Sequence, residues 1–243
     1  MMISTKDWLA YINKLSLIDK TAAAKMQAYV QKHGFGDTQA LIDYAYGIAT
    51  KYGEGSAALA AEMYDVIAEL SGKHLPPAEV APTPEYDEVA KAVNGTAKYR
   101  NTELVSNAVG RLVKRTGVDT TMKNAIRDGA EWAWIPHGVT CAFCLTLASR
   151  GWQKASKAAL KGGHAEHIHA HCDCTYAISF DGKPEYAGYD PDKYLEMYEN
   201  AEGSSSKDKI NALRREKYQQ NKDKINAQKR AAYAERNKPR EKL

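Results

Sequence analysis

The chain has 243 residues, of which 44% are hydrophobic and 26% are charged, and its formal net charge is +4. This length and composition predict a folded protein with a substantial core, divided into more than one unit. No apolar run approaches the roughly 20 residues of a membrane-spanning helix, so we expect no membrane partner. Four cysteines and an N-terminus without an apolar signal segment argue against a secreted, disulfide-dependent fold.

The N-terminal region, residues 1–71, has the apolar spacing of helices, and the density of alanine supports this prediction. We expect three helices: from the N-cap Thr5 to Gly34, from Asp37 to Lys51 and, after a break at Gly53-Glu54-Gly55, from Ser56 to Leu70. Four prolines then mark residues 72–85 as an extended linker. We place the main domain boundary there, with the N-terminal helices as a separate arm or bundle.

The second region, residues 86–200, predicts further helices and a small strand-containing element. The expected helices span Tyr86 to Val93, Thr102 to Arg115 and Asp119 to Ala130, with Gly117 and Pro136 as breaks and a short helix from Cys141 to Ser149. Short strands are expected between Thr175 and Phe180. They are expected to end at Asp181-Gly182, which is a turn pair. The predicted fold class is therefore mainly α with a small α+β element.

The tail, residues 201–243, carries the whole basic excess of the chain. From Lys207 onward there are 13 Lys and Arg against 5 Asp and Glu, and the segment Lys207–Arg215 recurs fifteen residues later. A solvated charged helix and a tail that contacts nucleic acid or a partner protein both explain this pattern. The candidate contact residues are Arg214, Arg215, Lys217, Lys229 and Arg230.

All four cysteines lie in two short clusters, Cys141-Ala142-Phe143-Cys144 and His169-Ala170-His171-Cys172-Asp173-Cys174. Thiolates and imidazoles gathered in this way are typical of a tetrahedral structural zinc site, which would pin residues 132–180 into one zinc-knuckle-like unit. Reduced thiols without a ligand role and disulfides are the alternatives. An all-cysteine site and a site with three cysteines and one histidine both remain open.

The enzymatic alternative is a metal-dependent nuclease of the HNH type, with His167, His169 or His171 as general base. A closed Cys/His site has no open coordination position for water, which favours a structural role without catalytic residues. A further alternative is a zinc-containing nucleic-acid-binding protein that uses the basic tail.

Several segments together resemble the phage minor capsid proteins of the Mu F-like head-morphogenesis superfamily. They are Trp134-Ile135-Pro136, the two cysteine clusters, and Leu147-Ala148-Ser149-Arg150-Gly151 between them; the segment from Tyr52 to Tyr64 looks like variants from phages of Gram-positive hosts. The resemblance covers about residues 40 to 182. Mapped onto this chain, the Cys/His pattern of the superfamily gives the candidate ligands Cys141, Cys144, His169, Cys172 and Cys174.

The resemblance implies a structural phage head protein without catalysis of its own. Its expected partners are the portal and other capsid proteins, and packaged DNA through the basic tail. Its expected location is the capsid interior of the virion, after assembly in the host cytoplasm. The metal is an inference from the donor residues, and zinc is the expected cofactor.

Overall fold

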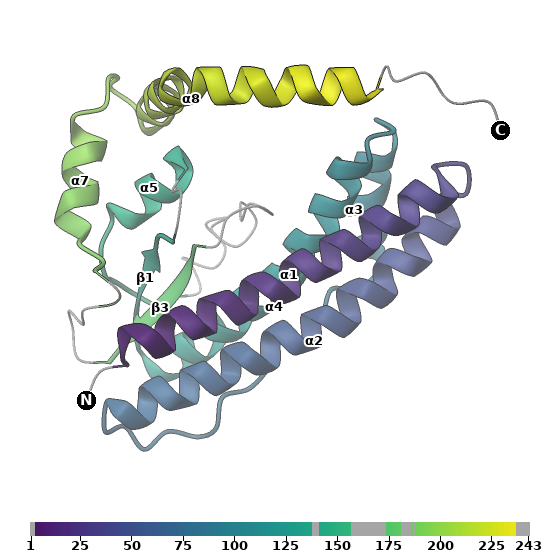
Figure 1. Ribbon diagram of the computed structural model, residues 1–243. Coiled ribbons are helices and arrows are strands. Elements are labelled where there is room, and N and C mark those ends of the chain that lie inside the picture. Colours follow the sequence, from purple (N-terminus) through teal and green to yellow (C-terminus); the bar gives the residue numbers. More distant parts are fainter. Residues whose placement is uncertain (1–2, 138–140, 157–173, 181–185, 187, 237–243) are drawn as a thin grey trace.

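The computed structural model describes residues 3–137, 141–156, 174–180, 186 and 188–236. Within these residues the chain forms seven helices and one three-stranded antiparallel sheet (Figure 1). The long helices lie side by side as a bundle, and the small sheet packs against one end of it. The prediction of a mainly helical fold with a small strand-containing element is confirmed at this level.

The first two helices form an antiparallel hairpin (Figure 1). Helix α1 (Thr5–His33) begins after Ser4, whose hydroxyl caps the first turn, and ends at Gly34, whose φ of 72° favours glycine. The expected N-cap Thr5 is therefore wrong by one residue, because the Ser4 side chain is the one that accepts a free N–H of the first turn. Helix α2 (Thr38–Leu70) returns along α1.

Helices α2 and α4 (Thr102–Asp128) run without interruption through glycines that the sequence predicts as breaks. A Cβ at Gly53 would lie 3.2 Å from Thr116 Oγ1, and a Cβ at Gly117 would lie 2.5 Å from Ser56 Oγ. The two glycines let α2 and α4 approach closely. The predicted helix breaks are wrong because this packing outweighs the roughly 1 kcal/mol that a glycine costs inside a helix.

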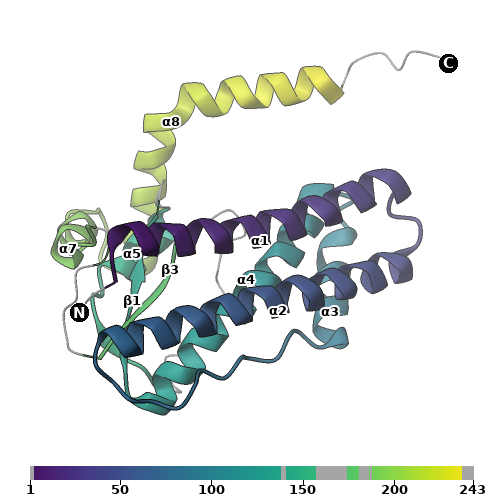
Figure 2. The ribbon, with the colours of Figure 1, turned by 60° about the horizontal axis from the view of Figure 1, so that its bottom comes forward.

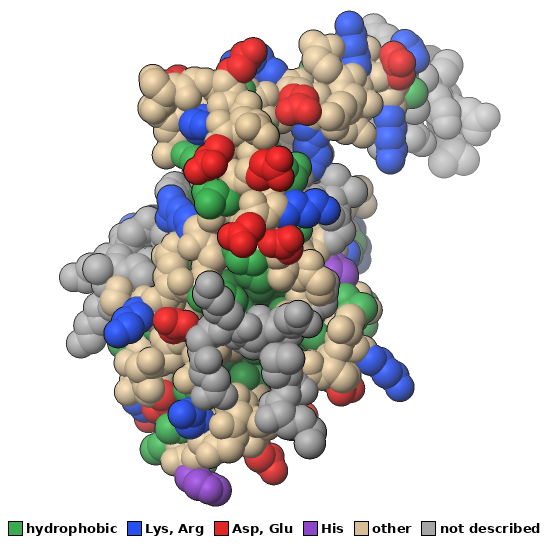
Figure 3. Space-filling model, turned by 90° about the vertical axis from the view of Figure 1, so that its left-hand side faces the viewer, with side chains coloured by type: hydrophobic (Ala, Val, Ile, Leu, Met, Phe, Trp, Pro, Cys, Tyr) green, Lys and Arg blue, Asp and Glu red, His purple; other side chains and the backbone are tan. Residues whose placement is uncertain are grey.

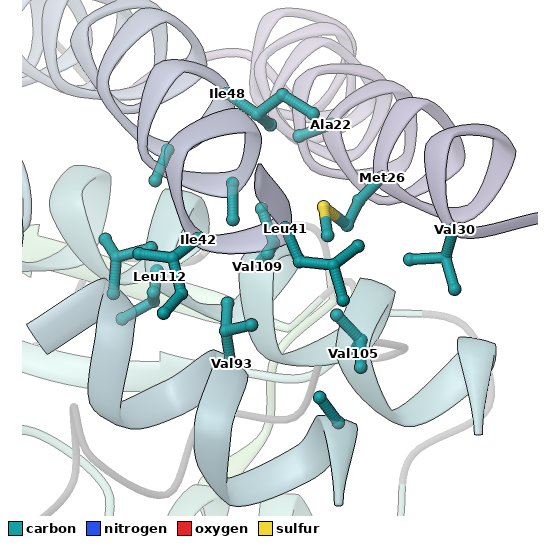
Figure 4. Close-up of a cluster of buried hydrophobic side chains, with 14 of the residues drawn as sticks. Ala22, Met26, Val30, Leu41, Ile42, Ile48, Val93, Val105, Val109 and Leu112 are labelled. Atoms are coloured by element: carbon teal, nitrogen blue, oxygen red, sulfur yellow. The ribbon is translucent and has the colours of Figure 1, made fainter. Parts of the chain in front are cut away.

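Helix α3 (Tyr86–Ala97) completes the bundle, and its core takes side chains from all four helices (Figure 4). The core includes Met26 and Val30 of α1, Leu41 and Ile48 of α2, Val93 of α3, and Val105, Val109 and Leu112 of α4. Helices from both sides of the proline-rich segment therefore bury one common core. The N-terminal helices thus share their core with α3 and α4, and the division of the chain into domains at this segment stays a prediction.

The proline-rich segment contains no helix or strand over residues 73–85 and lies along one face of α4. Three α4 side chains, spaced by one turn, hold its backbone. Thr120 accepts the N–H of Ala81 at 3.0 Å, Asn124 accepts the N–H of Glu79 at 2.9 Å and donates to its carbonyl at 2.8 Å, and Arg127 donates to the carbonyls of Pro76 and Pro77. We call residues 76–81 the strap.

The sheet has the strand order β2-β1-β3, with β1 (Glu131–Ile135) paired antiparallel to both β2 (Gln153–Lys154) and β3 (Thr175–Ser179). Only β3 is predicted by the sequence. Alternate residues point to opposite faces of a strand. One face places Ala133, Ile135 and Ala177 against α1, and the other places Trp132, Trp134 and Tyr176 against α4.

Three further helices extend from the sheet: α5 (Ala142–Ala148), α7 (Pro191–Glu199) and α8 (Ser206–Arg236). Helix α5 and the first turns of α8 pack together through Leu145 and Leu213. Beyond this contact, α8 bends and extends away from the body of the molecule (Figures 1 and 2). The tail is thus helical up to Arg236.

Candidate functional site

The structure brings three of the four cysteines into one buried cluster. Cys141 caps the N-terminus of α5, Cys144 lies in its first turn, and Cys174 directly precedes β3. Cys144 and Cys174 are buried and Cys141 is half-buried, and all three pack in the same group of hydrophobic side chains. Cys141 and Cys144 thus share one hydrophobic cluster with Cys174, which is far from them in the sequence.

Two of these sulfur atoms accept backbone hydrogen bonds. Cys141 Sγ lies 3.4 Å from the amide nitrogen of Cys144, and Cys174 Sγ lies 3.3 Å from that of His137. N–H donors stabilise a thiolate more than a thiol, because they face the developing negative charge. Since a metal ligand must be a thiolate, these two sulfurs are suited to metal binding.

Aromatic side chains surround the cysteine cluster. The ring of Tyr176 lies edge-to-face with Trp132 and Trp134, at centroid distances of 4.7 Å from both. Met122 of α4 packs in the same cluster. Burial raises the pKa of Tyr176 well above its usual range, so its phenol stays neutral at pH 7. The cluster is thus an apolar environment in which the sulfurs are the reactive atoms.

The remaining candidate ligands, His169 and Cys172, lie outside the described residues, as do the alternative general bases His167 and His171. In the described part of the chain, no three Cys, His, Asp or Glu side chains are grouped closely enough to hold a metal ion. The described residues therefore supply, at most, part of a metal centre. The full ligand set stays a prediction.

The basic residues predicted to contact nucleic acid or a partner lie on α8. Four of them, Arg214, Arg215, Lys229 and Arg230, are exposed and Lys217 is half-buried. Below α8, acidic side chains gather over α7 (Figure 3), which carries Asp192, Glu196 and Glu199. The basic helix thus rises from an acidic surface of the body.

A buried polar cluster between α1, α2, α4 and β3 is absent from the sequence-based predictions. Asp19 and Lys114, 8% and 7% exposed, line a cavity of about 10 Å³ together with Ser56 and Thr175. This volume admits about one water molecule. The sequence does carry one signal that could have predicted this cluster, the position of Asp19. This residue falls on the otherwise apolar stripe of α1, seven residues before Met26. The cluster is enclosed, so it joins the sheet to the bundle rather than forming an open site.

Comparison with known proteins gives one family. The model of a phage protein family, described as VG15 protein, matches residues 2–201. This range covers the bundle, the sheet and the cysteine clusters, and it ends before α8 begins. No curated protein and no solved structure matches the chain.

Proposed function

The chain belongs to the VG15 protein family, a family of phage proteins, and from this we propose that it is a structural protein of the phage head. The family match carries the phage assignment. The head assignment is supported by the resemblance of the cysteine and Leu147–Gly151 segments to Mu F-like minor capsid proteins, although the family that the match shows is VG15 and not that superfamily.

The proposed partners are the portal and other capsid proteins, with packaged DNA contacted through α8. The proposed location is the capsid interior, after synthesis in the host cytoplasm. No described helix is long and apolar enough to cross a membrane.

We also propose that the cysteine cluster is part of a structural zinc site. Cys141, Cys144 and Cys174 would supply thiolates, and His169 or Cys172 would supply the fourth donor. The packing of three cysteines in one hydrophobic cluster and the N–H groups that face two of their sulfurs support this proposal. A bound zinc ion would contribute folding free energy to residues 132–180.

Metal analysis tests the zinc proposal. Protein purified under reducing conditions is expected to contain about one zinc per chain, since one site of four donors holds one ion. The double variant Cys141→Ser with Cys144→Ser is expected to lose it. Thr146→Ala is the matched control, because it removes a buried hydroxyl from the same helix and leaves every sulfur in place. Zinc-free wild-type protein, or equal zinc in the two variants, would overturn the proposal.

Particle composition tests the head assignment separately. Mass spectrometry of purified phage heads and separated tails is expected to find this chain in the heads, at low abundance relative to the major capsid protein. Finding it in the tails, or in infected cells and never in particles, would contradict the assignment. Neither result depends on whether the cysteines bind metal.

We propose that the protein has no catalysis of its own, and a cleavage assay distinguishes this from the nuclease alternative. Supercoiled plasmid incubated with the protein and Mg²⁺ or Mn²⁺ is expected to stay intact. Metal-dependent cleavage that disappears in His169→Ala would establish the nuclease instead. Cleavage that persists in His169→Ala and also in His167→Ala and His171→Ala would indicate a contaminant.

A further inference from the structure

The charges of α8 are sorted onto two sides of the helix. At about 100° per residue, one arc of about 160° carries six basic residues and, up to Arg230, no acidic one. The six residues are Lys207, Arg214, Lys217, Lys222, Lys224 and Lys229. The three acidic residues of the same stretch, Asp208, Glu216 and Asp223, fall within an opposite arc of about 80°. We call the first arc the basic face.

The basic face differs from the set of contact residues that the sequence predicts. Arg230 falls within the acidic arc, and Arg215 lies at the edge of the basic face, 3.8 Å from Glu202. Lys222 and Lys224 belong to the face and are exposed. The 15-residue repeat explains the sorting, because fifteen residues advance about 22 Å along a helix and turn it by only about 60°. Lys207 and Arg214 are therefore repeated within the basic face, as Lys222 and Lys229.

The basic face is open to a large partner. Helix α8 contacts the body through Ile210 and Leu213 in its first turns and then bends away from it (Figure 2). From Arg214 to Arg230 the sequence holds seven Lys and Arg, against one aromatic residue, Tyr218, and one large aliphatic residue, Ile225. This stretch therefore offers mostly charge and hydrogen-bond donors, with little apolar area for a protein partner.

We propose that the basic face of α8 binds the phosphate backbone of duplex nucleic acid. Stable protein–protein interfaces usually need a buried apolar or aromatic centre, whereas interfaces with nucleic acid are much more polar and positively charged. The basic face matches the second kind. Tyr218, 40% exposed among these cations, adds a hydroxyl donor for a phosphate oxygen. The binding is independent of base sequence, because phosphate contacts carry no sequence information.

This inference extends the proposed head function, in which packaged DNA is the nearest polyanion. Its test uses purified full-length protein, so failure of the head assignment would leave the binding result intact. Absence of binding would likewise leave the head assignment untouched.

Two double variants with the same loss of charge test the proposal. Lys222→Gln with Lys229→Gln removes two charges from the basic face, and Arg215→Gln with Arg230→Gln removes two from outside it. Anisotropy of a fluorescein-labelled 20-base-pair duplex of mixed sequence, between 50 and 300 mM KCl, gives the affinity and its salt dependence. Glutamine keeps the helix propensity, and far-UV circular dichroism checks that helix content is unchanged.

The face variant is expected to bind at least about tenfold more weakly at 0.1 M salt, with the slope of log K against log salt reduced by about two. The control variant is expected to lose less than about threefold. Equal losses in the two variants would show a response to net charge alone and would overturn the proposal. No binding at 50 mM salt, or equally tight binding of polyglutamate, would overturn it in favour of an acidic protein partner or none.

Discussion

At the crossing of α2 and α4, Gly117 faces Ser56 so closely that a side chain has no space. An added Cβ would lie 2.5 Å from Ser56 Oγ and 3.1 Å from its carbonyl oxygen. The carbonyl belongs to the α2 backbone, so the clash could be relieved only by moving one helix away from the other. Gly47 in the interior of α2 is the contrasting case. It is exposed, and a Cβ added there would have no other atom within 4 Å.

These two glycines give opposite predictions for the same substitution. Gly117→Ala is expected to lower the free energy of unfolding by about 1–3 kcal/mol, because overpacking outweighs the gain in helix propensity. Gly47→Ala is expected to raise it by about 0.5–1 kcal/mol through helix propensity alone. Urea denaturation measures both changes. Stabilisation by both substitutions would show that the two helices are not in close contact.

Asp119 on α4 is a half-buried carboxyl that shares its positive partner with Glu88. Arg115 donates two hydrogen bonds to Glu88 and lies 3.4 Å from Asp119. Burial raises the pKa of Asp119 to about 6, although the charge of Arg115 lowers it. The ionised form therefore costs free energy in the folded protein at neutral pH.

The pH dependence of stability follows from this shift. Because the folded pKa is higher than the unfolded value of 3.8, the contribution of Asp119 is complete below about pH 4 and is lost as pH rises through 6. Asp119→Asn cannot ionise, so it is expected to be more stable than wild type by about 1–3 kcal/mol at pH 7.5, a range reduced for partial exposure. The advantage should disappear at pH 4. Denaturation at both pH values checks this, and an equal difference at both would contradict it.

At the scale of the elements, Asn124 is one of the three α4 side chains that hold the strap, and it is the one that bonds both backbone groups of a single strap residue. Asn124 is fully buried and satisfies both the N–H and the carbonyl of Glu79. The Nζ of Lys123, the residue before Asn124, lies 2.8 Å from the carboxylate of Glu79. The side chains of Lys123 and Glu79 are both exposed. An exposed ion pair contributes little, whereas a lost buried amide leaves backbone groups unsatisfied.

Asn124→Ala is therefore expected to cost about 2 kcal/mol and to speed hydrogen exchange at the amides of residues 78–81. Lys123→Ala is the control at the adjacent position and is expected to cost at most about 0.5 kcal/mol, with exchange unchanged. Urea denaturation and exchange mass spectrometry measure the two effects. Slow exchange in both variants would show that the strap is held by other contacts.

At the scale of the whole molecule, the bundle and the sheet are joined by shared helices. Helix α1 places Met26 and Val30 in the bundle core and Trp8 and Ile12 in the cluster beneath the sheet. Met63 of α2 likewise packs against two clusters on the sheet side. Unpacking of either the bundle or the sheet would therefore also disturb helix α1, which packs in both.

We therefore expect the bundle and the sheet to unfold together. All four tryptophans lie in the sheet layer, so tryptophan fluorescence reports that layer, while the far-UV signal is dominated by the long helices. The two urea transitions should coincide, as in a two-state unfolding reaction. A far-UV transition that precedes the fluorescence transition would show that the N-terminal helices are a separate unit after all.

Local signals in the sequence predict most element positions correctly. Gly34 ends α1, the apolar run before Asp181 forms β3, and the short helix after Cys141 is α5. The two helix breaks that the sequence wrongly predicts, inside α2 and α4, have a common cause. From their sequence neighbours, Gly53 and Gly117 are predicted to break helices. In the structure their lack of a side chain lets α2 and α4 pack closely, and this depends on contacts with the other helix.

For the candidate site, spacing alone groups Cys141 with Cys144, because both lie within one turn of chain. That Cys174 joins them depends on the pairing of β1 with β3, in which Ile135 lies opposite Thr175. Strand pairing depends on contacts between distant residues, and no local pattern encodes it. The basic face of α8 is the opposite case, since a helical wheel of the sequence is sufficient to find it once the segment is known to be helical.

By itself, then, the sequence determined the mainly helical class, the basic character of the tail and the grouping of cysteines, because composition and short-range spacing specify these. Tertiary structure alone decided that α2 and α4 are continuous, that the proline-rich segment is a bound strap and that three cysteines pack in one cluster with Tyr176. Each of these depends on the free energy of contacts between residues far apart in the chain. That free energy exceeds the local preferences of about 1 kcal/mol on which a reading of the sequence rests.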